Sequence, residues 1–388
     1  MEILKRYFKS PENSYFLFGP RGTGKTTWLK MNCKNELIID LLDPGIYRRY
    51  KARPERLKEL IEGNTDKKNV IIDEVQKVPE LLDVVHLIIE EKSKLKFILT
   101  GSSARKIKQK GVDLLAGRAV IRSIHPFMAS ELKDRFNLEK ALHTGLIPLI
   151  VYAQDPVDTL NAYIALYMKE EIQTEGFVRD IGSFARFLEA ISFSHGTVLN
   201  LNNVARECEV KRETVGGYIE ILYDLLMAYS LPVFTKRAKR AVIKHPKFYF
   251  FDAGVFRIIR PAGPLDRPGE IDGPNLEGLV AQHIRAWIDY SHSSYKLYYW
   301  RTKSGIEVDF IIYGKDGFWA IEVKNSKRIY RKELRPLKTF CHDYPECKPM
   351  LVYRGDEKLL IDNILCIPCD TFLKSIKPDR SLLDEFSR

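Results

Sequence analysis

Residues 19–26 read Gly-Pro-Arg-Gly-Thr-Gly-Lys-Thr and fill every position of the pattern GxxxxGK[ST]. Between a strand and a helix, such a loop binds phosphate through its backbone N–H groups and the positive end of the helix. The Lys25 ammonium would reach the β- and γ-phosphates of a nucleotide, and the Thr26 hydroxyl would bind Mg²⁺. We expect ATP to contact the whole loop, at Gly19, Pro20, Arg21, Gly22, Thr23, Gly24, Lys25, Thr26 and Thr27.

Two carboxylates, Asp73 and Glu74, follow the apolar run 70–72. An uninterrupted apolar run predicts a strand that is covered on both faces. At the end of such a strand, Asp73 would hold the Mg²⁺, usually through water, and Glu74 would orient or polarise the attacking water. The alternative is that the pair caps a helix, since Pro79 opens a helical segment shortly afterwards.

A further strand is expected over residues 96–100, and Gly101-Ser102-Ser103 follows it. A polar side chain at this strand end would sense the γ-phosphate or position the water. Thr100 is the first candidate for this catalytic position, and Ser103 is the second. The alternative is a strand that ends in an ordinary turn.

These motifs resemble those of the AAA+ superfamily of ATPases. The resemblance implies ATP hydrolysis with Mg²⁺, assembly into a homo-oligomer, and an arginine that completes the site within one subunit or between two. Arg118 and Arg105 match the expected position of that arginine, and a surface role is the alternative for each. The segments that carry the resemblance are GPRGTGKT at 19–26, IIDEVQ at 71–76, LTGSS at 99–103 and LLAGRA at 114–119.

Strands and helices alternate over residues 1–130, the expected nucleotide-binding domain. This alternation predicts an α/β fold, in which a parallel sheet carries helices on both faces and binds its ligand at the carboxyl ends of the strands. The expected strands are 15–18, 37–40, 70–73, 96–100 and 119–124, and the expected helices are 25–32, 53–62 and 79–92.

Residues 131–198 are expected to form a helical, lid-like region. Apolar residues recur there at helical spacing within 158–172 and 182–193. Residues 199–260 then resemble a winged helix, with helices at 201–208 and 211–223 and strands at 230–234 and 247–251.

The second of these helices is expected to face outward at Arg212, Glu213, Thr214 and Tyr218. The basic residues between the two strands suit contacts with DNA phosphates. They are Lys236, Arg237, Lys239 and Arg240, with Lys244 and Lys247 following. Packing or binding to a protein partner is the alternative use of this segment.

A Pro/Gly-rich linker over 261–274 precedes a last domain at 275–388. A helix is expected at 275–290, and strands at 297–301, 305–312 and 318–324. Strand residues two apart share a face, so Glu307 and Asp309 would point together, as would Glu322 and Lys324. The carboxylates would bind Mg²⁺, and Lys324 would orient a water or stabilise a pentacovalent phosphate.

This pattern resembles the restriction-endonuclease-like superfamily, in which an acid precedes a pair [D/E]-x-K. Asp309 matches the first acid, Glu322 and Lys324 match the pair, and Glu277 matches an acid on the first helix. A proline that often precedes the first acid is replaced by Val308. The resemblance implies a smaller α/β nuclease-like domain, and a half-buried hairpin with a paired Glu and Lys is the alternative.

The net charge of +11 favours a polyanionic partner such as nucleic acid, and a merely basic soluble protein is the alternative. The stretch 324–338 alone holds seven Lys or Arg. The chain of 388 residues, 45% hydrophobic, is long enough for two to four domains. It contains no run that approaches the roughly 18 apolar residues of a membrane span. Its first residues lack the apolar core of a signal peptide, so a cytoplasmic protein is expected.

The six cysteines are expected to be reduced thiols. Cys366 and Cys369 have CxxC spacing, and a zinc site built with Cys341, His342 and Cys347 is the alternative to ordinary buried cysteines. Two functions remain in view. The first is an ATPase coupled to DNA processing, and the second is a nucleotide-switched module that binds DNA or a protein through an inactive nuclease-like domain.

Overall fold

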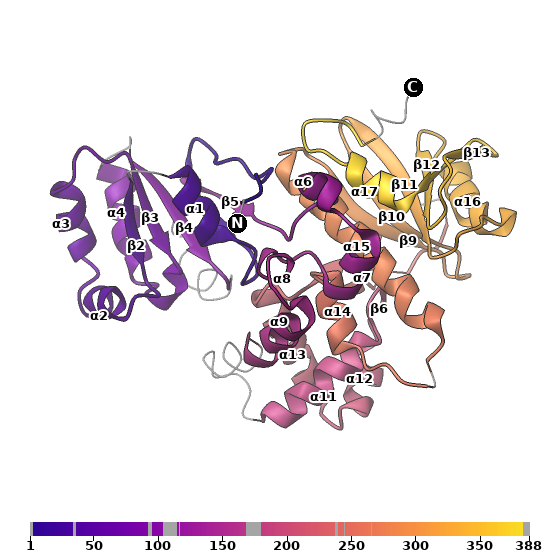
Figure 1. Ribbon diagram of the computed structural model, residues 1–388, viewed down its shortest axis with the longest axis horizontal. Coiled ribbons are helices and arrows are strands. Elements are labelled where there is room, and N and C mark those ends of the chain that lie inside the picture. Colours follow the sequence, from indigo (N-terminus) through magenta and orange to yellow (C-terminus); the bar gives the residue numbers. More distant parts are fainter. Residues whose placement is uncertain are drawn as a thin grey trace. The chain divides into compact units, whose positions relative to one another are not determined.

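The computed structural model describes residues 3–33, 36–91, 95–103, 115, 117–167, 180–236, 240–243, 245–264 and 266–382. The chain forms two compact units. The first, called the nucleotide unit below, comprises residues 8–125 and 223–227. The second, called the C-terminal unit, comprises residues 1–7, 126–222 and 228–388. Figure 1 shows both units and labels many of their elements.

The nucleotide unit is built on a five-stranded sheet in the order β2-β3-β4-β1-β5, and every neighbouring pair is parallel. This confirms the expected α/β sheet of P-loop type. Its strands are β1 Ser14–Phe18, β2 Leu37–Asp40, β3 Asn69–Asp73, β4 Lys96–Gly101 and β5 Ala119–Ser123. Its helical segments are α1 Lys25–Asn32, α2 Pro44–Ala52, α3 Arg56–Glu62, η1 Val75–Lys77 and α4 Leu81–Glu91.

Alternation along the strands gives this sheet two apolar faces. Phe16, Ile72 and Leu99 lie on the face that packs with buried residues of α2, α3 and α4. Tyr15 lies on the other face, near Phe8, whose ring contacts Trp28 of α1 at 4.8 Å. The sheet is thus covered on both sides, which explains why its central strands are uninterrupted apolar runs.

The C-terminal unit contains a six-stranded sheet, β13-β14-β12-β11-β10-β9, and a three-stranded sheet, β6-β8-β7. The strands are β6 Thr197–Val198, β7 Ala228–Leu231, β8 Lys247–Phe250, β9 Lys296–Arg301, β10 Glu307–Gly314, β11 Gly317–Lys324, β12 Lys348–Tyr353, β13 Leu359–Ile361 and β14 Ile364–Pro368. The helical segments are α6 Ala129–Leu132, η2 Lys133–Arg135, α7 Leu138–Thr144, α8 Pro148–Val151, α9 Pro156–Ala162, η3 Tyr163–Tyr167, α11 Ile181–Ser192, α12 Leu201–Glu207, α13 Arg212–Asp224, α14 Ala253–Ile259, α15 Pro268–Tyr290, η4 Arg331–Leu334, α16 Arg335–Asp343 and α17 Cys369–Ser375.

The helices expected at 201–208 and 211–223 are present as α12 and α13. The strand expected at 247–251 is present as β8, and it pairs antiparallel with β7, which ends at Leu231 and so contains only the first two residues of the strand expected at 230–234. The outward position expected for Tyr218 is wrong. Its side chain is buried, and its ring lies 5.0 Å from Phe184 and 5.2 Å from Phe187 of α11. This aromatic side chain lies five residues after the exposed Glu213 and joins α13 to α11.

The basic segment between β7 and β8, whose residues were expected to suit DNA phosphates, makes contacts within the C-terminal unit. It runs along β9, where Phe234 N–H donates to Tyr299 O at 2.7 Å and Ile243 N–H donates to Arg301 O at 3.0 Å. Arg240 pairs with Asp343 at 2.5 Å, and Lys236 Nζ lies 4.3 Å from the centre of the Tyr313 ring. Arg237, Lys239 and Lys244 lie outside the described residues.

The hairpin expected from 305 to 324 is present as β10 and β11, which pair antiparallel from Phe310–Ile321 to Gly314–Gly317. The linker expected over 261–274 is wrong in its second half, because α15 begins at Pro268 and continues through Pro274. Pro268 takes the first helical position, where proline costs no hydrogen bond. Among the described helices, none is both long and apolar enough to cross a membrane.

Candidate functional site

The phosphate-type loop lies between β1 and α1, at the carboxyl end of the sheet. Gly22 and Gly24 have φ values of 79° and 87°, a backbone region that glycine adopts without strain. A Cβ at Gly19 would come within 2.6 Å of the Ile124 carbonyl oxygen. Lys25 is 6% exposed, and its Nζ donates to Gly19 O at 2.6 Å and to Pro20 O at 3.3 Å. The carbonyl groups at the start of the loop therefore bind the ammonium group of Lys25.

Asp73 ends β3 beside this loop, as the motif predicts. Thr26 Oγ1 donates to Asp73 Oδ2 at 2.7 Å, and the Thr100 hydroxyl donates to Asp73 Oδ1. Burial raises the pKa of Asp73, whereas the hydrogen bonds from Thr100 and Thr26 act in the opposite direction. A hydroxyl and a carboxylate at this spacing are hard oxygen ligands of the kind that Mg²⁺ prefers, so these residues fit the ion.

Glu74 lies immediately beyond the strand, in a left-handed conformation with φ 58°. Its N–H donates to Thr100 Oγ1 at 3.0 Å, and its carboxylate accepts from Ser102 Oγ at 2.9 Å and from Gln76 Nε2. Thr100 thus contacts both acids. Gln76 and Ser102 were not predicted as site residues, although both lie within the motifs IIDEVQ and LTGSS.

The arginine candidates have different outcomes. Arg118 immediately precedes β5, and Ala119 pairs with Ser14, so Arg118 lies at the amino end of the sheet. The loop follows the other end of β1, about 16 Å away at the rise of a five-residue strand. Arg118 pairs with Glu90 there and does not reach the loop of its own chain. Its role between subunits stays a prediction, and Arg105 lies outside the described residues.

A second polar cluster lies in the C-terminal unit, where α15, β10 and β11 bring Glu277, Asp309, Glu322 and Lys324 together. Lys324 Nζ donates to Glu322 Oε1 at 2.6 Å, and Asp309 Oδ2 accepts from Val323 N–H at 2.8 Å. Burial, followed by the charge of Asp309, raises the pKa values of Glu277 and Glu322. The four residues that the nuclease-like motif selects are therefore neighbours.

The centre of this cluster is occupied by Lys247, the first residue of β8. Its side chain is 1% exposed, and its Nζ lies 2.9 Å from Glu277 Oε1, 2.5 Å from Glu307 Oε1 and 3.6 Å from Asp309 Oδ1. The expectation that Lys247 contacts DNA phosphates is therefore wrong. The only sequence signal for its burial is a lysine that opens the apolar run Phe248–Phe251.

Tyr249, two residues further on the same face of β8, donates from its hydroxyl to Glu277 Oε1 at 2.5 Å. Burial acts against the charge of Lys247, but Glu277, Asp309 and Glu307 outweigh it and raise the lysine pKa. An ammonium group at this position leaves no place for a divalent cation to bind the same carboxylates. Within the described residues, no group of three or more His, Cys, Asp or Glu side chains is arranged to hold a metal ion.

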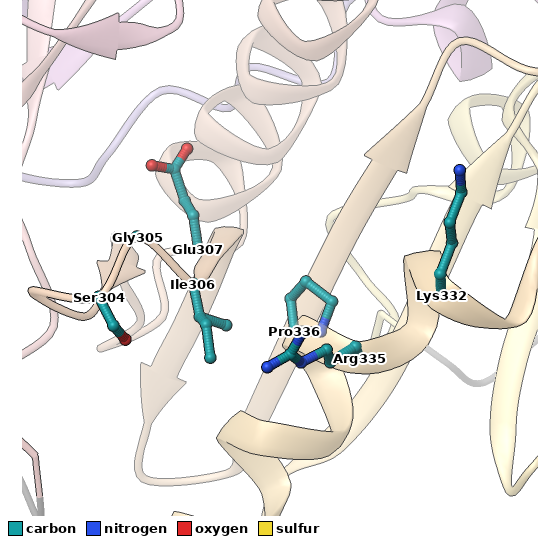
Figure 2. Close-up of a pocket in the computed structure, with 7 residues that line it drawn as sticks. All are labelled: Ser304, Gly305, Ile306, Glu307, Lys332, Arg335 and Pro336. Carbon is teal, nitrogen blue, oxygen red and sulfur yellow. The ribbon is translucent and has the colours of Figure 1, made fainter.

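A pocket of about 440 Å³ adjoins the cluster at Glu307. Figure 2 shows Ser304, Gly305, Ile306 and Glu307 on one side of it and Lys332, Arg335 and Pro336 on the other. Away from this pocket, Cys366 and Cys369 are buried, and burial raises the pKa of their thiols to about 11 and about 12.

Comparison with known protein families divides the chain into three parts. Residues 11–133 match a family described as AAA domain, which supports an ATP-binding ATPase of AAA+ type. Residues 135–265 and residues 272–372 match two domains of unknown function, DUF8612 and DUF4143. No curated protein matches the chain.

Three solved structures are similar to parts of the chain at low identity. Domain III of the replication initiation protein DnaA from Thermotoga maritima is 15% identical, with 42% of this chain and 78% of that chain covered and a TM-score of 0.24. A replication initiator DnaA bound to AMPPCP and single-stranded DNA is 16% identical, with 55% and 83% covered and a TM-score of 0.27. Protein VC1899 from Vibrio cholerae is 14% identical, with 93% and 96% covered and a TM-score of 0.22.

Proposed function

We propose that the nucleotide unit binds ATP with Mg²⁺ and hydrolyses it. The observation that carries this proposal is a chain of hydrogen bonds that links Thr26, Asp73, Thr100 and Glu74. Thr26 is the last residue of the complete phosphate-type loop, so the chain of hydrogen bonds begins at the loop. Lys25 would exchange its bonds to the loop carbonyls for phosphate oxygens, and the N–H groups at the start of α1 would receive the remaining phosphate charge.

Thr26 and Asp73 would hold the Mg²⁺. When bound, the ion would supply positive charge that stabilises the negative charge of the phosphates. Glu74 would accept a hydrogen bond from the attacking water and align it with the γ-phosphate. For this, its carboxylate must leave Ser102 or share its oxygens, because Ser102 and Gln76 both donate to Oε2.

The replacement Glu74→Gln tests this assignment. It keeps the size of the side chain and removes the negative charge, so ATP binding should stay within about threefold of wild type while turnover falls by about a hundredfold or more. Binding is measured with a fluorescent ATP analogue, and turnover by phosphate release. Lys25→Ala is the matched control, because it should weaken binding itself. Turnover at the wild-type rate in Glu74→Gln would remove Glu74 from the role.

We further propose that ATP hydrolysis is coupled to DNA binding or processing. Support comes from the net charge of +11 and from the segment 327–338, whose basic side chains are exposed around η4 and the start of α16. Two of them, Lys332 and Arg335, line the pocket beside Glu307. ATP turnover measured with duplex DNA, with single-stranded DNA and without DNA tests the coupling. Turnover that no DNA changes would favour a protein partner.

The second candidate function is a nucleotide-switched binding module in which the C-terminal unit holds DNA or a protein and does not cut it. The observation that favours it is the engagement of Glu277, Glu307 and Asp309 by Lys247. The two candidates differ in Mg²⁺-dependent loss of a DNA substrate. Cleavage that Asp309→Ala abolishes and Lys25→Ala leaves intact would decide for the first.

A further inference from the structure

The acidic cluster of the C-terminal unit contains four carboxylates, from Glu277, Glu307, Asp309 and Glu322, on three different elements or their ends. Four negative charges that approach this closely repel one another, and burial makes the repulsion stronger than in water. The cluster therefore requires positive charge in its interior. In this protein the interior charge comes from the chain itself.

We propose that Lys247 is a resident cation that takes the place of a divalent metal ion and excludes it from this cluster. Its ammonium group has three N–H donors and faces three carboxylates, at 2.9, 2.5 and 3.6 Å. A metal ion would need the same oxygens at about 2.0–2.6 Å from a common centre. The ammonium and the metal ion cannot occupy that centre together.

The position of Lys247 is enforced by its strand. All four residues of β8 are buried, and β8 is hydrogen-bonded on both sides, to β6 and to β7. Tyr249, on the same face, donates to the same Glu277 oxygen and ties β8 to α15 a second time. Withdrawal of Lys247 would break these contacts, so the exclusion of metal is a property of the folded unit.

A second observation supports the proposal that these carboxylates would bind a metal ion if Lys247 were absent. Glu322 is 3% exposed, and its Oε2 has no hydrogen-bond partner, whereas its Oε1 accepts from Lys324. A buried carboxylate oxygen without a partner is costly and is normally satisfied by a donor or a cation. Lys247 meets the other three acids and leaves this oxygen unmatched.

The inference concerns the acidic cluster alone and does not depend on ATP hydrolysis, so its test uses the full chain without nucleotide. Mn²⁺ binding is measured by electron paramagnetic resonance of the free ion for wild type and for Lys247→Met, with Lys348→Met as the exposed-lysine control. We expect Lys247→Met to bind Mn²⁺ at least about tenfold more tightly than wild type or the control, because only it frees the carboxylates. The gain should vanish when Asp309→Asn is added.

Two results overturn the proposal. One is an Asp309-dependent Mn²⁺ site in wild type that is as tight as the site in Lys247→Met. The other is a folded Lys247→Met protein with no Asp309-dependent Mn²⁺ site. Folding is checked by circular dichroism, because removal of one partner of a buried ion pair destabilises a protein by about 3–5 kcal/mol.

If Lys247→Met does not fold, reductive methylation of the wild-type amines, read by mass spectrometry, decides instead. The Lys247 amine should be protected relative to Lys332, equally with and without Mn²⁺. Methylation of Lys247 as fast as that of Lys332 without Mn²⁺ would show that Lys247 does not fill the cluster. Methylation that becomes as fast only when Mn²⁺ is added would show that the metal ion displaces Lys247.

Discussion

Replacement of Thr100 by valine isolates the hydroxyl that joins the two acids of the nucleotide unit. Valine has nearly the shape of threonine, and Thr100 is fully buried, so the change removes two hydrogen bonds with little repacking. The carboxylate of Asp73 loses one donor but keeps Thr26, and the Glu74 N–H loses its acceptor. A hydrogen bond to a charged group contributes about 1.5–3 kcal/mol, and an unsatisfied buried N–H costs about 1–3 kcal/mol.

We therefore expect Thr100→Val to lower the free energy of unfolding of the nucleotide unit by roughly 3 kcal/mol. Turnover of ATP should fall about tenfold, which corresponds to about 1.4 kcal/mol, because Glu74 would lose the bond that holds its left-handed backbone. ATP binding should change by less than about threefold, since the loop and Lys25 are untouched. Thr100→Ser should leave ATP turnover near the wild-type rate, because it keeps the hydroxyl. It should lower the free energy of unfolding by only about 1 kcal/mol, through the loss of a buried methyl group.

Hydrogen exchange of peptides that cover β3 and β4 reports the stability of this unit separately from the C-terminal unit. Phosphate release and binding of a fluorescent ATP analogue report the other two quantities. Equal exchange and turnover in Thr100→Val and wild type would refute the reasoning about the hydroxyl. A loss of ATP binding as large as the loss of turnover would also refute it, because Thr100 would then contact the nucleotide rather than position Asp73 and Glu74.

Three further predictions concern the C-terminal unit. Burial raises the pKa of Asp252 to about 6 from 3.8, so the folded protein takes up this proton before the unfolded chain does. The free energy of unfolding of wild type, relative to that of Asp252→Asn, should therefore rise by up to roughly 3 kcal/mol as the pH falls from 7 to 4. Urea unfolding measures this difference, and a difference that stays constant with pH would contradict the raised pKa. Tyr218→Ala should lower the free energy of unfolding by about 3 kcal/mol through lost packing. The exposed Arg212→Ala should change unfolding by less than about 0.5 kcal/mol and should weaken any DNA binding in a fluorescence anisotropy titration.

The parts of the fold that the sequence predicted are those whose signals are local. The strands β1, β3 and β4 are short apolar runs, and the loop after β1 is a contiguous motif, so each could be recognised within about ten residues. The helix α2 was not predicted because Tyr50 is its only buried residue, which leaves no apolar stripe. Its start signal was present, since Asp43 Oδ1 accepts from Ile46 N–H at 2.8 Å and Pro44 follows.

Side-chain partners from distant segments could not be predicted in the same way. The positions of Glu277, Asp309, Glu322 and Lys324 relative to one another followed from a motif, but Lys247 reaches them from a strand that forms part of another sheet. A lysine is usually exposed, and its burial becomes favourable only when carboxylates surround it. Those carboxylates lie 30 or more residues further along the chain, and the one local signal, the apolar run that follows Lys247, also occurs after surface lysines.

Among the described residues, the buried lysines Lys25 and Lys247 therefore have opposite electrostatic surroundings and suit opposite functions. Lys25 donates to carbonyl oxygens of Gly19 and Pro20, which carry no formal charge, and a phosphate anion can compete for such a lysine. Lys247 faces the carboxylates of Glu277, Glu307 and Asp309, and Glu307 also pairs with Arg301. An added anion would be repelled there, and an added cation would have to displace the lysine first. The charge of the surroundings, rather than burial itself, makes one lysine fit to receive a ligand and the other fit to replace one.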